Sequence, residues 1–197
     1  GQGYSVIRGQ APLAAFRVPE GPWRGFAIAA AHSDSPTFKV REEAEVSGAG
    51  KTMRLSVEPY GGGIYRSWLD RPLSVAGRVL VRTAAGVEPR LVYVDRDLLV
   101  IPSVAIHMDR AVNKGTALDP AVDLLPLLGM EDKGAFRRLI AAAAGVEEAD
   151  LVTTDLFLYP RMRGTCVGAA GELLCAPRLD DLQCVYGCLQ GFLAAGT

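Results

Sequence analysis

The chain has 197 residues, a net charge of -1 and a hydrophobic fraction of 49%, so it can bury the core of one large domain or two small ones. Its charges are interspersed, and no basic patch is present that would attract nucleic acid or anionic lipid. The longest strongly apolar stretches, residues 26–31 and 139–146, are far shorter than the roughly 20 residues that cross a bilayer. We therefore expect a soluble globular protein that binds neither nucleic acid nor a membrane.

The N-terminus and the cysteines bear on the cellular compartment. Residues 1–4 lack the basic region and apolar core of a secretory signal, and because the chain does not start with Met we expect its natural N-terminus to be missing. The four cysteines contain no CxxC pair. Cys184 and Cys188 lie four residues apart on a predicted helix, where we expect buried thiols rather than zinc ligands. Reduced thiols favour a cytoplasmic protein.

The first part of the chain, residues 1–40, predicts strands. Alternating or continuous apolar residues mark strands at residues 4–8, 13–18 and 25–31. The third is apolar on both faces, which is typical of a central parallel strand covered by helices on each side. His32 follows directly and would therefore lie at the carboxyl end of that strand.

The middle part, residues 41–152, changes character. Turn-bounded β segments occur at residues 53–58, 74–83, 90–93 and 98–101. Two helices are predicted next, at residues 122–128 with a kink at Pro126 and at residues 131–144, where Gly145 ends the helix. This block has the composition of a β-rich module inserted into an α/β domain.

The last part, residues 153–197, returns to the α/β pattern. Strands are predicted at residues 155–159 and 172–176, followed by helical spacing of apolar residues from Leu182 to Leu193. Asp180 and Asp181 stand at the start of that helix, where acidic residues complement the helix dipole. Asp180 is thus expected at a strand-to-helix junction.

His32, Ser33 and Asp34 can carry chemistry because residues two apart on an extended segment point to the same side. Asp34 could therefore orient the imidazole of His32, which a crevice at a strand end would expose to a ligand. The alternative is that His32 is a polar residue at the start of a loop, where its ring nitrogens form local hydrogen bonds and bind no ligand.

Asp180 also has two interpretations. As an isolated acid before a helix it would be an N-cap without catalytic meaning. If His32 and Asp180 both lie at strand ends of one sheet, they would supply an imidazole and a carboxylate, which are two of the ligands that a hydrolytic zinc site requires.

Four segments in order carry a specific resemblance to the aspartyl aminopeptidase family. They are AHSDSP at residues 31–36, GGGIYRSWLDRPL at 61–73, IPSVAIHM at 101–108 and APRLDDL at 176–182. The glycines at 61–63 do not indicate a phosphate loop, because no Lys and Ser/Thr follow them as that motif requires.

The resemblance implies a zinc-exopeptidase α/β sheet domain that is interrupted by a β-rich dimerisation domain, and an enzyme that removes N-terminal Asp or Glu from peptides. It implies that His32 binds one metal ion, that Asp180 bridges two zinc ions, and that Asp34 is an active-site residue behind them. His107 would reach the substrate site of a neighbouring subunit in a homo-oligomer, although it could also be an interface histidine.

The resemblance also limits what the 197 residues are expected to do. The family's general base and its remaining metal ligands would follow residue 197, so we expect this chain alone to be inactive. Two other functions stay open: a non-catalytic oligomeric scaffold, and a related dinuclear zinc exopeptidase with another specificity. Histidine and carboxylate sites accept several divalent ions, so the metal is expected, but not required, to be zinc.

Overall fold

The structure is a computed structural model that describes residues 2–8, 12–130 and 132–195. By its internal contacts, the chain divides into a smaller unit of residues 1–35 and 178–197 and a larger unit of residues 36–177. These borders differ from those expected at residues 40/41 and 152/153. The difference arises because residues 37–40 and 153–160 lie in strands of the larger unit's sheet.

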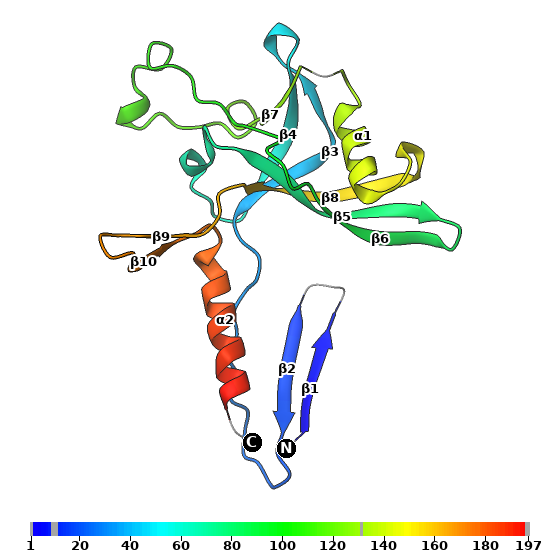
Figure 1. Ribbon diagram of the computed structural model, residues 1–197, viewed down its shortest axis with the longest axis vertical. Helices are drawn as coiled ribbons and strands as arrows, with labels where there is room; N and C mark the ends of the chain where they lie inside the picture. The colour runs from blue at the N-terminus through cyan, green and yellow to red at the C-terminus, as the bar shows by residue number, and fades with distance from the viewer. Residues whose placement is uncertain (1, 9–11, 131, 196–197) are drawn as a thin grey trace. The chain divides into compact units, whose positions relative to one another are not determined.

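A sheet of six strands of unequal length lies at the centre of the larger unit, in the order β6-β5-β8-β3-β4-β7 (Figure 1). All neighbouring strands in it are antiparallel. Two single bridges, Leu73 with Leu99 and Val100 with Leu127, link β5 to β7 through residues 99 and 100. The strands are β3 (Thr37–Ser47), β4 (Met53–Tyr60), β5 (Leu73–Thr83), β6 (Gly86–Tyr93), β7 (Leu127–Gly129) and β8 (Leu151–Pro160).

The inner face of this sheet carries the core. Alternate residues of β3, β4, β5 and β8 are buried, as expected where one face of an antiparallel sheet packs inward. Phe38 packs edge to face on Trp68 with ring centroids 5.1 Å apart. The short helices around the sheet are η1 (Ala49–Lys51), η2 (Tyr65–Trp68), η3 (Val112–Lys114) and η4 (Glu148–Asp150).

Helix α1 (Ala135–Ala144) covers part of the core with Phe136, Ile140 and Ala141. Its start is held from a distant strand: the carboxylate of Glu45 on β3 accepts the backbone N–H groups of Gly134 at 2.7 Å and of Phe136 at 2.8 Å. These bonds satisfy donors that a helix N-terminus leaves free, and they place a negative charge at the positive end of its dipole. Gly145 ends the helix in the left-handed conformation, as predicted.

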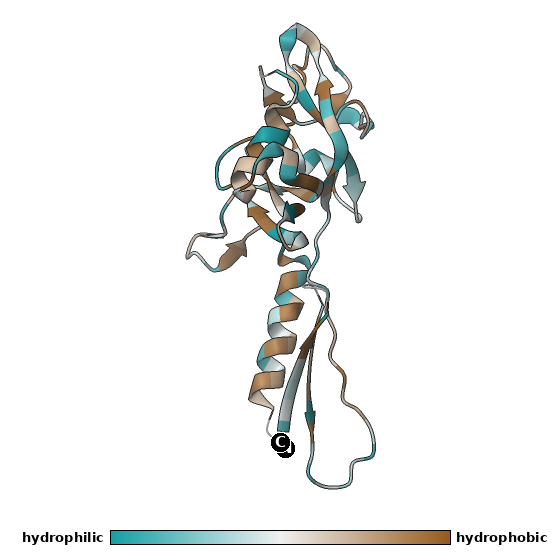
Figure 2. Ribbon diagram, turned by 90° about the vertical axis from the view of Figure 1, so that its right-hand side faces the viewer, coloured by the Kyte–Doolittle hydropathy of each residue, from teal (hydrophilic) through white to brown (hydrophobic). Residues whose placement is uncertain are grey.

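The smaller unit contains an antiparallel hairpin and one helix. The hairpin consists of β1 (Gln2–Ile7) and β2 (Leu13–Val18), and the helix is α2 (Leu179–Ala194). None of the described residues of α2 is buried, although hydrophobic residues recur along it (Figure 2). A second short hairpin, β9 (Thr165–Val167) and β10 (Leu173–Cys175), belongs to the larger unit.

Two predicted elements are absent from the described structure. Residues 25–31, expected as a buried central strand, form no strand, and Phe26 and Ile28 are 80% and 85% exposed. A strand requires a hydrogen-bonded neighbour, and no described segment pairs with this one. Residues 122–128, expected as a helix, form a turn followed by β7, because Leu127 exchanges backbone hydrogen bonds with Val100.

Other predictions are confirmed or adjusted. The strands at residues 13–18, 53–58 and 74–83 and the final helix occur close to their expected bounds. Residue 131, where the helix ending at Gly145 was expected to begin, lies outside the described residues. The expectation of buried thiols is wrong for Cys184, which is exposed, and Cys188 is only partly buried.

Candidate functional site

His32 lies in the smaller unit, on a segment without regular secondary structure. Its Nδ1 atom is 2.9 Å from the carbonyl oxygen of Asp34 and 3.2 Å from the carboxylate oxygen Oδ1 of the same residue. Both partners are acceptors, so they favour the tautomer in which Nδ1 carries the proton. The other ring nitrogen, Nε2, is then left with its lone pair for a different partner.

Asp180 supplies a carboxylate beside that nitrogen. His32 Nε2 lies 3.4 Å from Asp180 Oδ1, and the Ser35 hydroxyl donates a hydrogen bond of 3.0 Å to the backbone carbonyl of Asp180. The helix-cap interpretation does not fit Asp180, because this residue has non-helical backbone angles and the carboxylate that bonds the backbone of Cys184, within the first turn of the regular helix, belongs to Asp181. The peptide bond between Asp180 and Asp181 is cis.

Asp181 is part of the same cluster, which sequence reasoning missed by treating it as the first residue of a helix. Its Oδ2 atom accepts the backbone N–H of His32 at 3.3 Å and lies 3.8 Å from His32 Nε2. The pKa of the Asp181 carboxyl is lowered, first by a hydrogen bond from Cys184 and then by the His32 N–H. The doubled aspartate after Leu179 was the available sequence signal.

The acidic surroundings also act on His32. Its hydrogen bond to the backbone of Asp34 raises the pKa of the imidazole, and the negative charges of Asp181 and Asp34 raise this pKa further. Protons therefore compete for this imidazole more strongly than for an isolated histidine, and any cation near it is attracted by three carboxylates.

The separation of His32 and Asp180 fits a shared zinc ion. Two ligand atoms about 2.1 Å from one tetrahedral ion lie about 3.4 Å apart, which is the distance found between Nε2 and Oδ1. Within residues 2–8, 12–130 and 132–195, no three His, Cys, Asp or Glu side chains gather as a metal-binding group. The described chain thus presents two suitable ligands, with an imidazole oriented by a carboxylate.

His107, the fourth predicted site residue, belongs to the larger unit. It lies in a turn closed by a 2.8 Å hydrogen bond from the Met108 N–H to the carbonyl of Ala105, within the exposed part of the long segment between Ile101 and β7.

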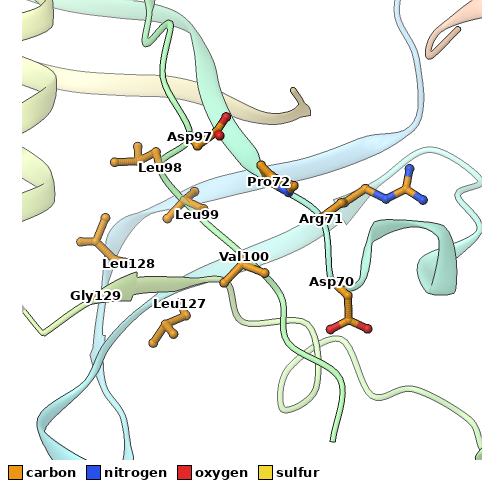
Figure 3. Close-up of a pocket in the computed structure, with 10 residues that line it drawn as sticks. All are labelled: Asp70, Arg71, Pro72, Asp97, Leu98, Leu99, Val100, Leu127, Leu128 and Gly129. Atoms are coloured by element: carbon orange, nitrogen blue, oxygen red, sulfur yellow. The ribbon is translucent and has the colours of Figure 1, made fainter. Parts of the chain in front are cut away.

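A hollow of about 410 Å³ opens elsewhere in the larger unit, near the start of that loop. Leucine side chains line one side of it, and Asp70 and Arg71 lie on the other (Figure 3). None of the four predicted site residues lines this hollow.

Comparison with known proteins places these motifs in a family. The family model described as aminopeptidase I zinc metalloprotease (M18) matches residues 1–197. The chain belongs to the M18 aminopeptidase family. M18 proteins are metallo-aminopeptidases, and the description of the family model itself names zinc. The resemblance read from the four motifs is confirmed at the level of the family.

Curated M18 relatives match nearly all of the chain. A probable M18 family aminopeptidase 2 of Clostridium acetobutylicum is 38% identical over 201 residues, which is 98% of this chain and 46% of that protein. A probable M18 family aminopeptidase 2 of Streptomyces avermitilis is 39% identical over 190 residues, covering 93% of this chain and 43% of that protein. The chain therefore spans less than half the length of these relatives.

Solved M18 structures share the fold. The cryo-EM structure of the Ape4 and Nbr1 complex aligns with a TM-score of 0.90 and 30% identity, over 98% of this chain and 41% of that one. The S. cerevesiae mApe1 dodecamer aligns with a TM-score of 0.67 and 26% identity, over 83% and 37% of the respective chains. The mixed α/β fold with one large sheet is thus an M18 fold.

No helix in the described part of the chain is long and apolar enough to cross a membrane.

Proposed function

We propose that His32 and Asp180 bind zinc in the active site of an M18 aminopeptidase that removes acidic residues from peptide N-termini. The observation that carries this proposal is the 3.4 Å separation of His32 Nε2 and Asp180 Oδ1, the spacing of two ligands on one tetrahedral ion. The family supports it, because the M18 model names zinc.

Asp34 has the orienting role in this proposal. It holds the Nδ1 side of His32 through both its carbonyl and its carboxylate, so that Nε2 faces the carboxylate of Asp180. A carboxylate behind a metal-bound histidine fixes the ring and increases its basicity. Asp34 would therefore act on the metal without touching it.

Asp180 could hold a second zinc ion with its remaining oxygen. Its side chain is 85% exposed, so space for a second ion lies beside it. When bound, zinc polarises the scissile carbonyl and lowers the pKa of a bound water. His32 and Asp180 would hold the ion that supplies this chemistry.

The larger unit, residues 36–177, would be the inserted dimerisation domain, and its His107 would reach the substrate site of a neighbouring subunit. The dodecamer among the similar structures supports homo-oligomerisation. The preference for N-terminal Asp or Glu and a cytoplasmic location rest on the family resemblance and the reduced cysteines.

The chain by itself would not hydrolyse peptides. Catalytic zinc takes about three protein ligands and a water, and the described residues bring two suitable groups together. Relatives more than twice as long would carry the others in sequence that this chain does not include.

The test compares the 197-residue chain with a protein of the relatives' full length that contains it. Each is loaded with zinc and assayed on otherwise identical peptides that begin with Asp, Glu or Leu. We expect the long protein to release Asp and Glu, its His32→Ala variant to lose zinc and activity together, and an Asp155→Asn control to retain both. Hydrolysis by the 197-residue chain would contradict the proposal that this chain lacks metal ligands needed for catalysis. A preference for the Leu peptide would contradict the proposed specificity for acidic N-terminal residues. A long protein that is inactive but still oligomerises would indicate a scaffold.

A further inference from the structure

The loop that carries His107 has little structure of its own, yet its two ends are held. Between residues 102 and 116 the chain forms only turns and η3, and Val104 and Met108 are 63% and 80% exposed. Few apolar contacts are therefore available to fix the position of His107, so hydrogen bonds at the ends of the loop must fix it instead.

Asp70 holds the first end. Its Oδ1 accepts the backbone N–H of Ser103 at 2.7 Å, and its Oδ2 accepts the Ser103 hydroxyl at 2.5 Å. The Asp70 N–H in turn donates to the carbonyl of Ile101 at 2.9 Å. Asp70 thus engages the chain on both sides of Pro102: a backbone bond reaches Ile101, and two charge-assisted bonds, which are stronger than neutral ones, reach Ser103.

Arg66 holds the second end. Its guanidinium donates a hydrogen bond to the backbone carbonyl of Thr116. The Thr116 hydroxyl donates to Asp109 Oδ1 at 3.1 Å, and that same oxygen accepts the Ala111 N–H at 3.1 Å. Residues 109–116, the second half of the loop, are therefore bound to Arg66 at Thr116 and are folded back on Asp109.

Both anchors lie on or directly after the short helix η2. Arg66 lies within η2 and Asp70 follows it two residues after its end. Trp68 between them is 8% exposed and packs on the buried Phe38 of β3. Figure 3 shows the Asp70 carboxylate directed away from the leucines that line the neighbouring hollow. The anchors are thus fixed to the core while their polar groups face the loop.

We propose that Asp70 and Arg66 are positioning residues for catalysis: they clamp the two ends of loop 103–116 and so set where its His107 is presented to the neighbouring subunit. This inference rests on the function proposed above for His107. It assigns a role to the segment GGGIYRSWLDRPL that lies outside the metal site, and it makes the precision of one subunit's active site depend on hydrogen bonds in another.

Hydrogen exchange of the 197-residue chain tests the clamp without catalysis. Asp70→Asn is the suitable variant, because Asp70 has a positive φ of 57° and Asn tolerates that conformation, while its amide replaces one acceptor by a donor. The matched control is Asp97→Asn, which changes an exposed carboxylate that contacts Arg161 at 3.2 Å. We expect exchange of the hydrogen-bonded Ser103 and Met108 amides to become about 10-fold faster in Asp70→Asn and to be unchanged in the control, because a neutral acceptor in place of the carboxylate weakens the Ser103 bonds by about 1.5 kcal/mol. Equal exchange in both variants would overturn the clamp.

Kinetics in the assembled full-length enzyme test the positioning role. We expect Asp70→Asn to lower kcat/KM about 10-fold, since small displacements of an active-site group have effects of this order or larger, with zinc content and oligomer size unchanged. In a His107→Ala background the same substitution should have no further effect, because Asp70 acts only through His107. A purely structural role would lower kcat/KM in both backgrounds, and that result would overturn the proposal.

The two experiments separate this inference from the proposed function. If His107→Ala itself leaves kcat/KM unchanged, the role of His107 is wrong and the positioning role falls with it, even if exchange confirms the clamp. If exchange is unchanged while His107→Ala reduces activity, the proposed function stands and the clamp is overturned.

Discussion

His32 and Asp34 are joined at one ring nitrogen by two oxygens of the same residue, the carbonyl at 2.9 Å and the carboxylate at 3.2 Å from Nδ1. A substitution of the Asp34 side chain leaves the hydrogen bond to the Asp34 carbonyl in place, but it removes the contact with the carboxylate. This separates the orienting effect of the backbone from the electrostatic effect of the Asp34 side chain.

The first prediction uses that separation. Asp34→Asn removes the negative charge behind His32 but keeps the backbone bond, so we expect zinc affinity to fall about 10-fold, the lower end of the range for such partners of metal-binding histidines. Competition titration against a chelator of known affinity measures it in the full-length protein. Asp155→Asn, which alters a carboxylate paired with Lys39 and Arg78, is the control, and equal losses in both variants would refute the specific role of Asp34.

The second prediction concerns pH. The pKa of His32 is raised, chiefly by its backbone bond to Asp34 and then by nearby carboxylates. In the metal-free protein the protonated ring is therefore stabilised by folding: this contribution is fully present below the ordinary histidine pKa of about 6.5 and is lost as the pH rises through the raised value.

NMR titration of the His32 ring in the metal-free chain checks this. We expect a midpoint above about 6.5 in the wild-type chain and a lower midpoint, still raised, in Asp34→Asn, because the backbone bond remains. Zinc binding requires the neutral ring, so it should weaken as the pH falls below this midpoint. A midpoint that rises in Asp34→Asn would refute the charge effect.

The third prediction tests the long-range helix cap. Glu45→Ala removes the acceptor of the Gly134 and Phe136 N–H groups, and we expect the free energy of unfolding to fall by about 1 kcal/mol, typical of a lost cap. Glu43→Ala, two residues away and exposed, is the matched control and should be near neutral. Urea denaturation followed by circular dichroism measures both, and a loss of the same size in the control would show that the cap contributes nothing.

The sequence predicted those features that depend on local pattern. Strands with alternating burial such as β4 and β5, and the end of α1 at Gly145, follow from side-chain periodicity and glycine conformation. The cap by Glu45 was invisible, because it joins β3 to a helix far along the chain. Residues 25–31 show the opposite error: their apolar pattern predicts a central strand, but pattern alone cannot supply a hydrogen-bonded partner.

In the candidate site, too, some contacts could be predicted from local sequence and others could not. The pairing of His32 with Asp34 follows from their spacing on an extended segment. The approach of Asp181 to the His32 backbone, and of Ser35 to the Asp180 carbonyl, depends on the non-helical backbone angles of Asp180 and Asp181 at the start of α2, which no propensity predicts. Asp70 and Ser103 likewise meet because an isolated bridge between Leu69 and Ile101, far apart in the sequence, brings their segments together.

A fourth prediction concerns the close contact of β5 and β8 at Gly77. A Cβ atom on this residue would lie 2.2 Å from the backbone oxygen of Asp155, so Gly77→Ala must push two central strands apart. We expect the free energy of unfolding to fall by about 2 kcal/mol, as for other overpacked sites. Gly62→Ala, where the added atom meets nothing within 4 Å, should be near neutral. Indistinguishable denaturation midpoints for the two variants would contradict the strand contact.

Nitrogen NMR of the two histidines of the chain during titration with zinc tests directly whether His32 and Asp180 share a metal ion. We expect zinc to shift the Nε2 resonance of His32 while its Nδ1 stays protonated, to leave His107 unaffected in the isolated chain, and to cause no shift in Asp180→Asn. A zinc-dependent shift at His32 Nδ1, or a shift at Nε2 that persists unchanged in Asp180→Asn, would contradict a metal ion shared by His32 and Asp180.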